Sequence, residues 1–164
     1  MKQETIAVYP GSFDPVTLGH LDLIRRSLKI FDRVIVAVVS NPNKKPCFSL
    51  HERIEMLQET TQNLDGQVEV DSFEGLLVHY LKQKKANIVI RGLRAISDFE
   101  YEFEMALMNR RLSNDVETIF LTPSEEFTFL RARLVKEIAL LGGDISSLVP
   151  ATVMERLNRK IAEG

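Results

Sequence analysis

The chain has 164 residues, of which 45% are hydrophobic and 27% charged, a composition typical of a globular protein with its own core. Its formal net charge of −2 provides no overall basic field, which disfavours general binding to nucleic acid or to an anionic membrane. The single cysteine, Cys47, cannot form an internal disulfide, and no apolar run has the length of a signal peptide or a membrane span. We therefore expect a cytoplasmic protein that forms one domain over residues 1–164.

The first predicted element is a strand over residues 6–9, followed by a glycine-containing turn and an amphipathic helix. The turn carries Gly11, Ser12 and Gly19. Its spacing matches neither a P-loop nor the G-x-G-x-x-G fingerprint, which disfavours P-loop and NAD-binding assignments. A strand-to-helix turn of this kind presents backbone N–H groups and a helix N-terminus to an anion. His20 lies in the first turn of that helix, which favours a role at the anion over a packing role.

Strands and helices then alternate along the chain. The further predicted strands cover residues 33–40, 67–73, 87–91 and 117–121. The further predicted helices cover residues 50–61, 76–84 and 98–112, a segment with Leu130, Leu134, Ile138 and Leu141 on one face, and a last segment after Pro150. This alternation predicts an α/β fold: a single Rossmann-like, doubly wound domain with a five-stranded parallel sheet and helices on both faces. The mixed polarity of residues 67–73 places that strand nearer a sheet edge.

Local signals mark several helix ends. Ser49 and Glu52 form a capping box for the helix over residues 50–61. Ser97 or Asp98 is expected to cap the long helix. Gly142-Gly143 is expected to end the helix that precedes it.

The long helix over residues 98–112 has an apolar surface wider than packing on one sheet face requires. Its two stripes are Phe99, Phe103 and Ala106, and Tyr101, Met105, Met108 and Leu112. Two interpretations are open at this point: a deeply buried helix, or a subunit interface, since exposed apolar patches of this size are rare on monomers.

Cations gather at one edge of the predicted sheet. Ligands bind outside the carboxyl ends of the strands in a doubly wound sheet. The loops at those ends carry Ser12, His20, Lys44, Arg91 and Arg94, with Arg131 and Arg133 just beyond. Such a cluster in a chain of net charge −2 indicates a polyphosphate site. A hydrolase is disfavoured, because the sequence has neither a nucleophile elbow nor an Asp/His set with metal-ligand spacing.

Several segments together resemble a known family. Pro10-Gly11-Ser12-Phe13-Asp14-Pro15 with Thr17-x-Gly19-His20 resembles the T/HxGH signature of the nucleotidyltransferase superfamily. Lys44-Lys45-Pro46, residues 90–95, 98–102 and 108–110, and Leu134-Val135-Lys136-Glu137 narrow the resemblance to the bacterial phosphopantetheine adenylyltransferases. The resemblance spans nearly the whole chain. It implies transfer of AMP from ATP to 4′-phosphopantetheine with Mg²⁺, giving dephospho-coenzyme A and pyrophosphate by direct in-line displacement. It also implies a homohexamer built as a dimer of trimers, which favours the interface interpretation of the long helix.

The same resemblance assigns roles to individual residues. The catalytic residues it implies are His20, as transition-state stabiliser, with Lys44 and Arg91. The ATP-binding residues it implies are Ser12, Phe13, His20, Gly92, Leu93, Arg94, Glu102, Phe127, Thr128, Phe129, Leu130, Arg131, Ala132 and Arg133. The phosphopantetheine-binding residues it implies are Ser12, Lys44, Leu77, Arg91 and Asn109. No side chain is assigned to a metal, and Mg²⁺ is expected mainly through the ATP phosphates.

One departure and two alternatives remain. The family commonly has Ile-Ser-Ser-Ser where this chain has Leu130-Arg131-Ala132-Arg133, so these arginines either replace neutral donors with charged ones or point away. A nucleotidyltransferase for another phosphate acceptor, such as nicotinamide mononucleotide or glycerol phosphate, is disfavoured by residues 90–95 and Lys44-Lys45-Pro46. A non-catalytic nucleotide-sensing module is disfavoured because Ser12, His20, Lys44 and Arg91 are all present.

Overall fold

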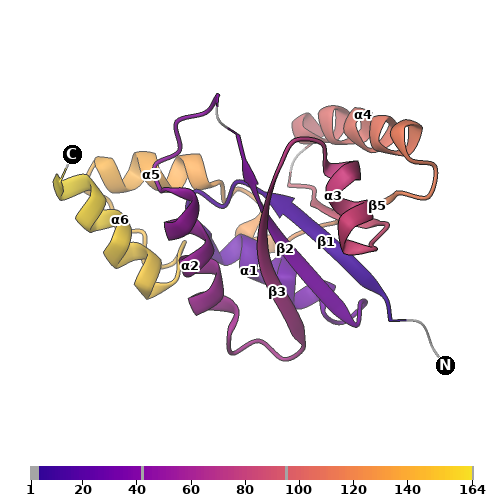
Figure 1. Ribbon diagram of the computed structural model, residues 1–164. Helices are drawn as coiled ribbons and strands as arrows, with labels where there is room; N and C mark the ends of the chain where they lie inside the picture. The colour runs from indigo at the N-terminus through magenta and orange to yellow at the C-terminus, as the bar shows by residue number, and fades with distance from the viewer. Residues whose placement is uncertain (1–3, 42, 95, 164) are drawn as a thin grey trace.

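The computed structural model describes residues 4–41, 43–94 and 96–163, and it has a five-stranded parallel sheet at its centre (Figure 1). The strands are β1 (Ile6–Gly11), β2 (Arg33–Ser40), β3 (Gln67–Glu74), β4 (Ile88–Gly92) and β5 (Glu117–Leu121). Their order in the sheet is β3-β2-β1-β4-β5. The chain therefore winds outward from β1 in one direction and then from β4 in the other. The carboxyl ends of β1 and β4 flank the switch point, where doubly wound sheets bind ligands.

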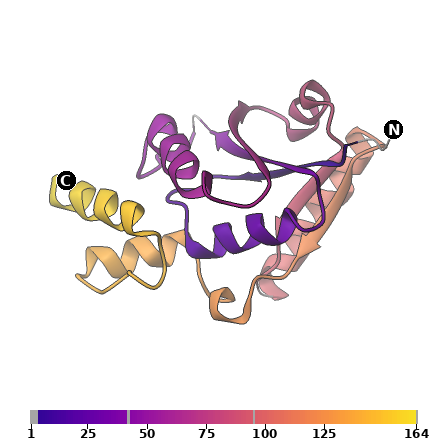
Figure 2. The same ribbon diagram turned by 90° about the horizontal axis from the view of Figure 1, so that it is seen from below.

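Both faces of the sheet are covered by helices. The helices are α1 (Leu18–Ser27), α2 (Leu50–Thr61), α3 (Leu77–Lys84), α4 (Ile96–Leu112), α5 (Ala132–Leu140) and α6 (Ala151–Glu163), with a short 3₁₀ turn, η1 (Glu125–Phe127). Side chains of α1 and α2 join one hydrophobic core, and those of α3 join a second core on the opposite face. In Figures 1 and 2, α5 and α6 extend from one end of the molecule and α4 lies at the other. None of the described helices has the length and apolar character needed to cross a membrane.

Successive side chains of β2 point to opposite faces of the sheet, and both faces are buried. This explains why its sequence is continuously apolar and does not alternate between polar and apolar residues. Val34 and Val36 pack in the core beneath α1 and α2, whereas Ile35 and Ala37 pack in the core beneath α3. Because successive side chains of a strand point to opposite faces, a central strand covered on both sides needs apolar residues at every position. The same physics predicts the edge position of the more polar β3, which the strand order confirms.

The observed ends of the helices can be compared with the capping residues predicted from the sequence. The capping box of Ser49 and Glu52 is present, and α2 ends at Thr61 as predicted. Gly142 follows the end of α5 with a φ of 77°, a conformation that favours glycine. The expected cap of the long helix is wrong: α4 begins at Ile96, so both Ser97 and Asp98 already lie inside its first turn. Ala95, which ends the matched segment at residues 90–95, lies outside the described residues.

The predicted buried face of the helix after Pro123 is only half right: Leu130 is buried and Ile138 packs against the core, but Leu134 and Leu141 are exposed. The helix covers only residues 132–140, and its buried side chains are Val135 and Ala139. Leu134 and Leu141 are 42% and 88% exposed. Leu130 is buried before the helix begins. The observed buried side is centred on Val135 and Ala139 with Ile138 at its edge, so it is rotated around the helix from the predicted one.

The interpretation of α4 as a deeply buried helix is contradicted. Its large apolar side chains stand open to solvent in the single chain, with Tyr101 at 63%, Leu112 at 53% and Met108 at 50% exposure. The helix packs against α3 and β5, where the ring of Phe99 meets that of Phe120. The opposite face of α4 therefore remains a broad exposed apolar surface.

Candidate active site

Two adjoining cavities open at the carboxyl ends of β1 and β4. The smaller has a volume of about 180 Å³ and the larger about 660 Å³. The residues that line both are Pro10, Gly11, Ser12, Arg91 and Glu102. The turn after β1 and the end of β4 thus form the shared wall of a two-part site, at the switch point of the sheet.

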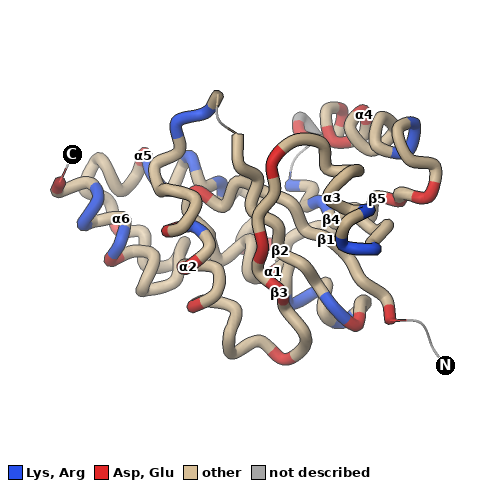
Figure 3. The backbone as a smooth tube through the Cα atoms, viewed as in Figure 1, with Lys and Arg blue, Asp and Glu red and all other residues tan. Residues whose placement is uncertain are grey.

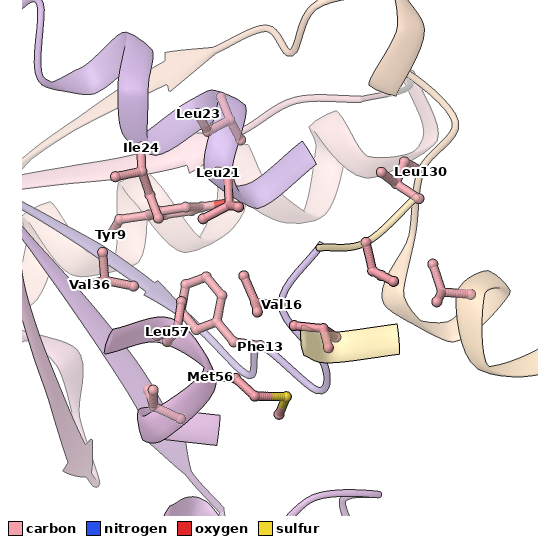
Figure 4. Packing of buried hydrophobic residues seen from close by; sticks show 14 of the residues in the cluster. Tyr9, Phe13, Val16, Leu21, Leu23, Ile24, Val36, Met56, Leu57 and Leu130 are labelled. Atoms are coloured by element: carbon pink, nitrogen blue, oxygen red, sulfur yellow. The ribbon is translucent and has the colours of Figure 1, made fainter. Parts of the chain in front are cut away.

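The turn after β1 is built around the ring of Phe13. This residue has a φ of 46°, which is uncommon for a residue with a side chain, and only 1% of its surface is exposed. The ring packs edge-on to Tyr9 and His20, with centroids 5.3 and 5.0 Å away, and belongs to the same buried core as Leu57 (Figure 4). A Cβ on Gly11 would lie 3.0 Å from this ring, so a larger residue would press on the buried ring and glycine leaves room for it. Phe13 therefore supports the turn from beneath while lining the smaller cavity.

His20 is oriented by the N-terminus of α1. The Thr17 N–H donates to His20 Nδ1 at 3.0 Å, and the His20 N–H donates to Thr17 Oγ1 at 3.3 Å, which completes a capping box. Because a backbone N–H points at Nδ1, that nitrogen is unprotonated and the ring proton lies on Nε2. This capping role was missed at the sequence level, although Thr17 stands three residues before His20 as a capping box requires.

The electrostatics of the site keep His20 neutral. Burial lowers the pKa of its imidazole to about 3, and the positive charge of Arg94 acts in the same direction. At neutral pH the ring is therefore a neutral N–H donor at Nε2. It lines the smaller cavity, where such a donor can meet a phosphate oxygen without taking part in proton transfer.

Arg91 is held at the boundary between the two cavities. Its Nε and Nη2 donate to the two carboxylate oxygens of Glu102 at 2.6 Å each, and Nη1 donates to the Pro10 carbonyl at 2.9 Å. Burial lowers the pKa of Arg91, but the hydrogen bonds and charge of Glu102 outweigh it, so the pKa stands above its ordinary value. Three of the five guanidinium N–H groups are used in this way, which leaves two for a ligand.

The arginines near the smaller cavity are arranged around Asp98. Arg94 Nη1 donates to the Leu130 carbonyl at 2.9 Å, and its Nε lies 4.0 Å from Asp98. Arg131 reaches the same carboxylate at 3.6 Å. Arg133 instead donates to Glu137 at 2.9 Å, with its side chain 88% exposed. Of the two arginines that replace the family's serines, Arg133 lines the larger cavity and Arg131 lines neither.

The larger cavity joins a cationic side to an apolar side. Lys44 and Lys45 line it from the loop after β2, and Lys136 lines it from α5. Figure 3 shows the basic positions, in blue, on the loop between β2 and α2. Leu77 and Met105 reach it from α3 and α4, which lie toward the other end of the molecule. Asn109 also lines it and is 8% exposed. The cavity therefore suits a long ligand with an anionic head and a mostly apolar tail.

Most of the predicted site residues line one of these two cavities. Those on the smaller are Ser12, Phe13, His20, Gly92, Arg94, Glu102, Phe127 and Leu130, together with Arg91. Those on the larger are Ser12, Lys44, Leu77, Arg91, Glu102, Asn109, Ala132 and Arg133. Those on neither are Leu93, Thr128, Phe129 and Arg131. Roles in binding and catalysis stay predictions for all of them.

Two charged residues at the site were missed from the sequence. Arg53, which is 5% exposed, donates to the Ser12 carbonyl at 2.8 Å. Asp14, interpreted as part of a simple turn, is 7% exposed and accepts hydrogen bonds from the loop after β2. Both lie on the larger cavity. A signal was available for Arg53, which stands four residues before Leu57 and so on the predicted apolar face of its helix.

Comparisons with known proteins give consistent results. The model of the cytidylyltransferase-like family matches residues 8–138. A phosphopantetheine adenylyltransferase of Desulfosudis oleivorans is 54% identical, over 95% of this chain and 92% of the relative. Another, of Caldanaerobacter subterraneus subsp. tengcongensis, is 56% identical over 94% of this chain and 96% of the relative.

Solved structures support the fold alone. A structure described as a putative nicotinate-nucleotide adenylyltransferase from Vibrio parahaemolyticus has a TM-score of 0.69 at 16% identity, over 97% of this chain and 95% of that one. The nicotinic acid mononucleotide adenylyltransferase of Plasmodium falciparum has a TM-score of 0.70 at 14% identity, over 98% and 96% of the two chains. The sheet and its helices are therefore arranged as in these two structures.

Proposed function

This chain belongs to the phosphopantetheine adenylyltransferases within the cytidylyltransferase-like family, and we infer that it transfers the adenylyl group of ATP to 4′-phosphopantetheine. The products are dephospho-coenzyme A and pyrophosphate. The observation that carries this function is the pair of adjoining cavities that share Ser12 and Arg91, with His20 in one and Lys44 in the other. A transfer between two anionic substrates needs such a boundary, because both phosphates must reach it together.

The chemistry asks for positioning more than for proton transfer. The attacking group is a phosphate monoester, whose second pKa of about 6 leaves it largely dianionic at neutral pH. An oxygen of this dianion forms the new bond to the α-phosphorus of ATP as the bond to the bridging oxygen breaks, and pyrophosphate carries away the electron pair. No general base is needed, and no covalent enzyme intermediate forms.

The residues at the boundary supply charge where the reaction needs it. We propose that Lys44 and the two remaining N–H groups of Arg91 hold the acceptor phosphate. His20 Nε2–H donates to the α-phosphate as negative charge develops there, aided by the partial positive charge at the N-terminus of α1. A neutral donor suits this role, since a fixed imidazolium also binds the ground-state triphosphate and gains less in the transition state.

Mg²⁺ is proposed to enter as part of the ATP complex. Among the described residues, no group of three or more His, Cys, Asp or Glu side chains is placed to hold a metal ion. Mg²⁺ in nucleotide enzymes is commonly bound by substrate phosphates and water with few protein ligands. Its contribution is to neutralise charge on the leaving pyrophosphate.

We also propose that the protein assembles as the homohexamer implied by the resemblance, and that it is cytoplasmic. The exposed apolar face of α4 supports assembly, because Leu107 and Leu112 are 49% and 53% exposed in the single chain. Leu112→Glu is expected to lower the mass measured by light scattering after size exclusion. An unchanged mass contradicts a role of this face in assembly.

The decisive experiment is incubation of the full chain with ATP, Mg²⁺ and 4′-phosphopantetheine, with mass detection of dephospho-coenzyme A. Nicotinamide mononucleotide and glycerol phosphate are tested in parallel as acceptors, scored by pyrophosphate release. Preferred turnover of either one overturns the substrate assignment. Binding of ATP without turnover of any acceptor points to a nucleotide-sensing module.

A further inference from the structure

A carboxylate lies in the larger cavity, which is proposed to hold the anionic acceptor. Asp14 follows Ser12 by two residues and lines the larger cavity, with its side chain 10% exposed. A buried negative charge at a phosphate site repels the ligand and loses its own hydration, so it needs compensating contacts. The hydrogen bonds and the ion pair of Asp14 therefore indicate its role.

Asp14 connects three separate elements of the rim. Its Oδ2 accepts the Cys47 N–H at 2.9 Å, and its Oδ1 accepts the Phe48 N–H at 2.8 Å. The ammonium of Lys136 lies 2.9 Å from Oδ2. One side chain therefore joins the turn after β1 to the end of the loop after β2 and to α5.

The loop that carries Lys44 is fastened at both ends. At its start, the Lys44 N–H donates to the Asn41 carbonyl at 3.1 Å, and the Asn43 N–H donates to Asn41 Oδ1 at 2.9 Å. At its end, Cys47 is fastened to Asp14. Lys44 is itself exposed, so its place is set by these two attachments of the backbone.

A buried cation completes the arrangement. Arg53 Nη1 donates to the Ser12 carbonyl at 2.8 Å and to the Val39 carbonyl at 3.3 Å. Burial lowers the pKa of Arg53, and the charge of Asp14 opposes that effect. Arg53 thus holds the turn against the end of β2, while Asp14 holds the loop that leaves β2.

We propose that Asp14 is the positioning residue for Lys44. It fixes residues 43–48 and, through Lys136, ties them to the middle of α5, so that Lys44 is held at the acceptor cavity before the substrate binds. This preorganisation avoids the entropy cost of ordering an exposed loop during binding. The inference rests on the proposed function, since it names the residue that prepares the acceptor half of that site.

The test is Asp14→Asn, alone and combined with Lys44→Ala. The carboxamide keeps the size of the side chain but has one acceptor oxygen. Its NH₂ opposes either the Phe48 N–H, at the position of Oδ1, or both the Cys47 N–H and the Lys136 ammonium, at the position of Oδ2. Loss of a charged hydrogen bond is expected to raise KM for 4′-phosphopantetheine about tenfold. The KM for ATP is expected to change by less than about twofold.

The double variant separates positioning from a general defect. If Asp14 acts through Lys44, Asp14→Asn adds less than about twofold to the acceptor KM once Lys44 is Ala. If the double variant instead raises the acceptor KM by the product of the two single effects, the proposal is overturned. Asp144→Asn, an exposed aspartate in the turn before α6, is the matched control and is expected to behave as the wild type.

Two further measurements keep the proposal testable if Asp14→Asn does not fold. Lys136→Gln breaks the ion pair and leaves both backbone bonds, so a smaller rise in acceptor KM is expected, again absent in the Lys44→Ala background. In any folded Asp14 variant, the Cys47 and Phe48 amides are expected to exchange faster, and unchanged exchange contradicts the proposal. Wild-type turnover of 4′-phosphopantetheine is measured alongside, so failure of the function itself is recognised separately.

Discussion

The two cavities share a wall but are built in different ways. The smaller is enclosed by β1, β4 and the capped start of α1, where His20 is bonded to Thr17 and Arg91 to Glu102. The larger is lined by an exposed loop and by helices at the periphery, and Lys44 stands there without a bonded side chain in the described structure. The reacting phosphates thus meet a rigid frame, while acceptor recognition is left to elements that can vary without disturbing it.

The largest expected effect tests the rigid side. His20→Ala removes one transition-state donor and is expected to lower kcat by at least ~10²-fold, with much smaller changes in either KM. Steady-state kinetics with both substrates measures this, and His51→Ala, on the exposed surface of α2, is the matched control. A variant that keeps most of its turnover removes His20 from the mechanism.

The next effect tests the acceptor side. Lys44→Ala is expected to raise KM for 4′-phosphopantetheine about tenfold, because one charged contact to the phosphate is lost. ATP affinity, measured by equilibrium binding, is expected to stay nearly unchanged. Lys29→Ala, on an exposed lysine just after α1, serves as control. Loss of ATP affinity alone would assign the loop after β2 to the other substrate.

A smaller effect is expected at the shared wall. Glu102→Gln weakens the two bonds that orient Arg91, so kcat/KM should fall several-fold for both substrates together. Glu104→Gln, on the exposed surface of the same helix, is expected to leave both values unchanged. A change confined to one substrate means that Arg91 belongs to one cavity rather than to the boundary.

The last prediction concerns the protonation of His20, and its main result is measured on the wild-type protein. With its pKa lowered to about 3, His20 is expected to remain neutral from pH 8 down to about pH 5, as followed by ring nitrogen shifts in NMR. The unfolded chain binds this proton near the ordinary pKa of about 6.5, so the wild type should lose stability as pH falls below that value. His20→Gln should lose less between pH 7 and pH 5, and equal losses contradict the lowered pKa.

Much of the fold was predictable because its signals are local. The continuous apolar run of β2 and the capping box of Ser49 and Glu52 identified their elements without any knowledge of neighbours. The motif ending in His20 indicated an anion at the turn after β1. The buried face of α5 was predicted only in part, because Leu134 and Leu141 follow the helical spacing of Leu130 and Ile138 but remain exposed once α5 packs beside α6.

The roles of the charged residues were harder to predict. A lysine or arginine after a strand looks the same in sequence whether it faces a ligand or a carboxylate. Arg131 turned out to lie beside Asp98, and Arg133 beside Glu137. Arg53 and Asp14 were missed for the same reason, since the partners that justify burying a charge come from other elements.

By itself, the sequence determined the elements, their parallel arrangement and the family, since these depend on periodicity, local capping and matched motifs. The tertiary structure decided which groups meet. Placing β4 beside β1 brings Arg91 to the Pro10 carbonyl, 81 residues away in the chain, and folding the loop after β2 back on the first turn brings Cys47 to Asp14. Hydrogen bonds act over about 3 Å, so contacts between distant segments exist only once the sheet order has put their ends together.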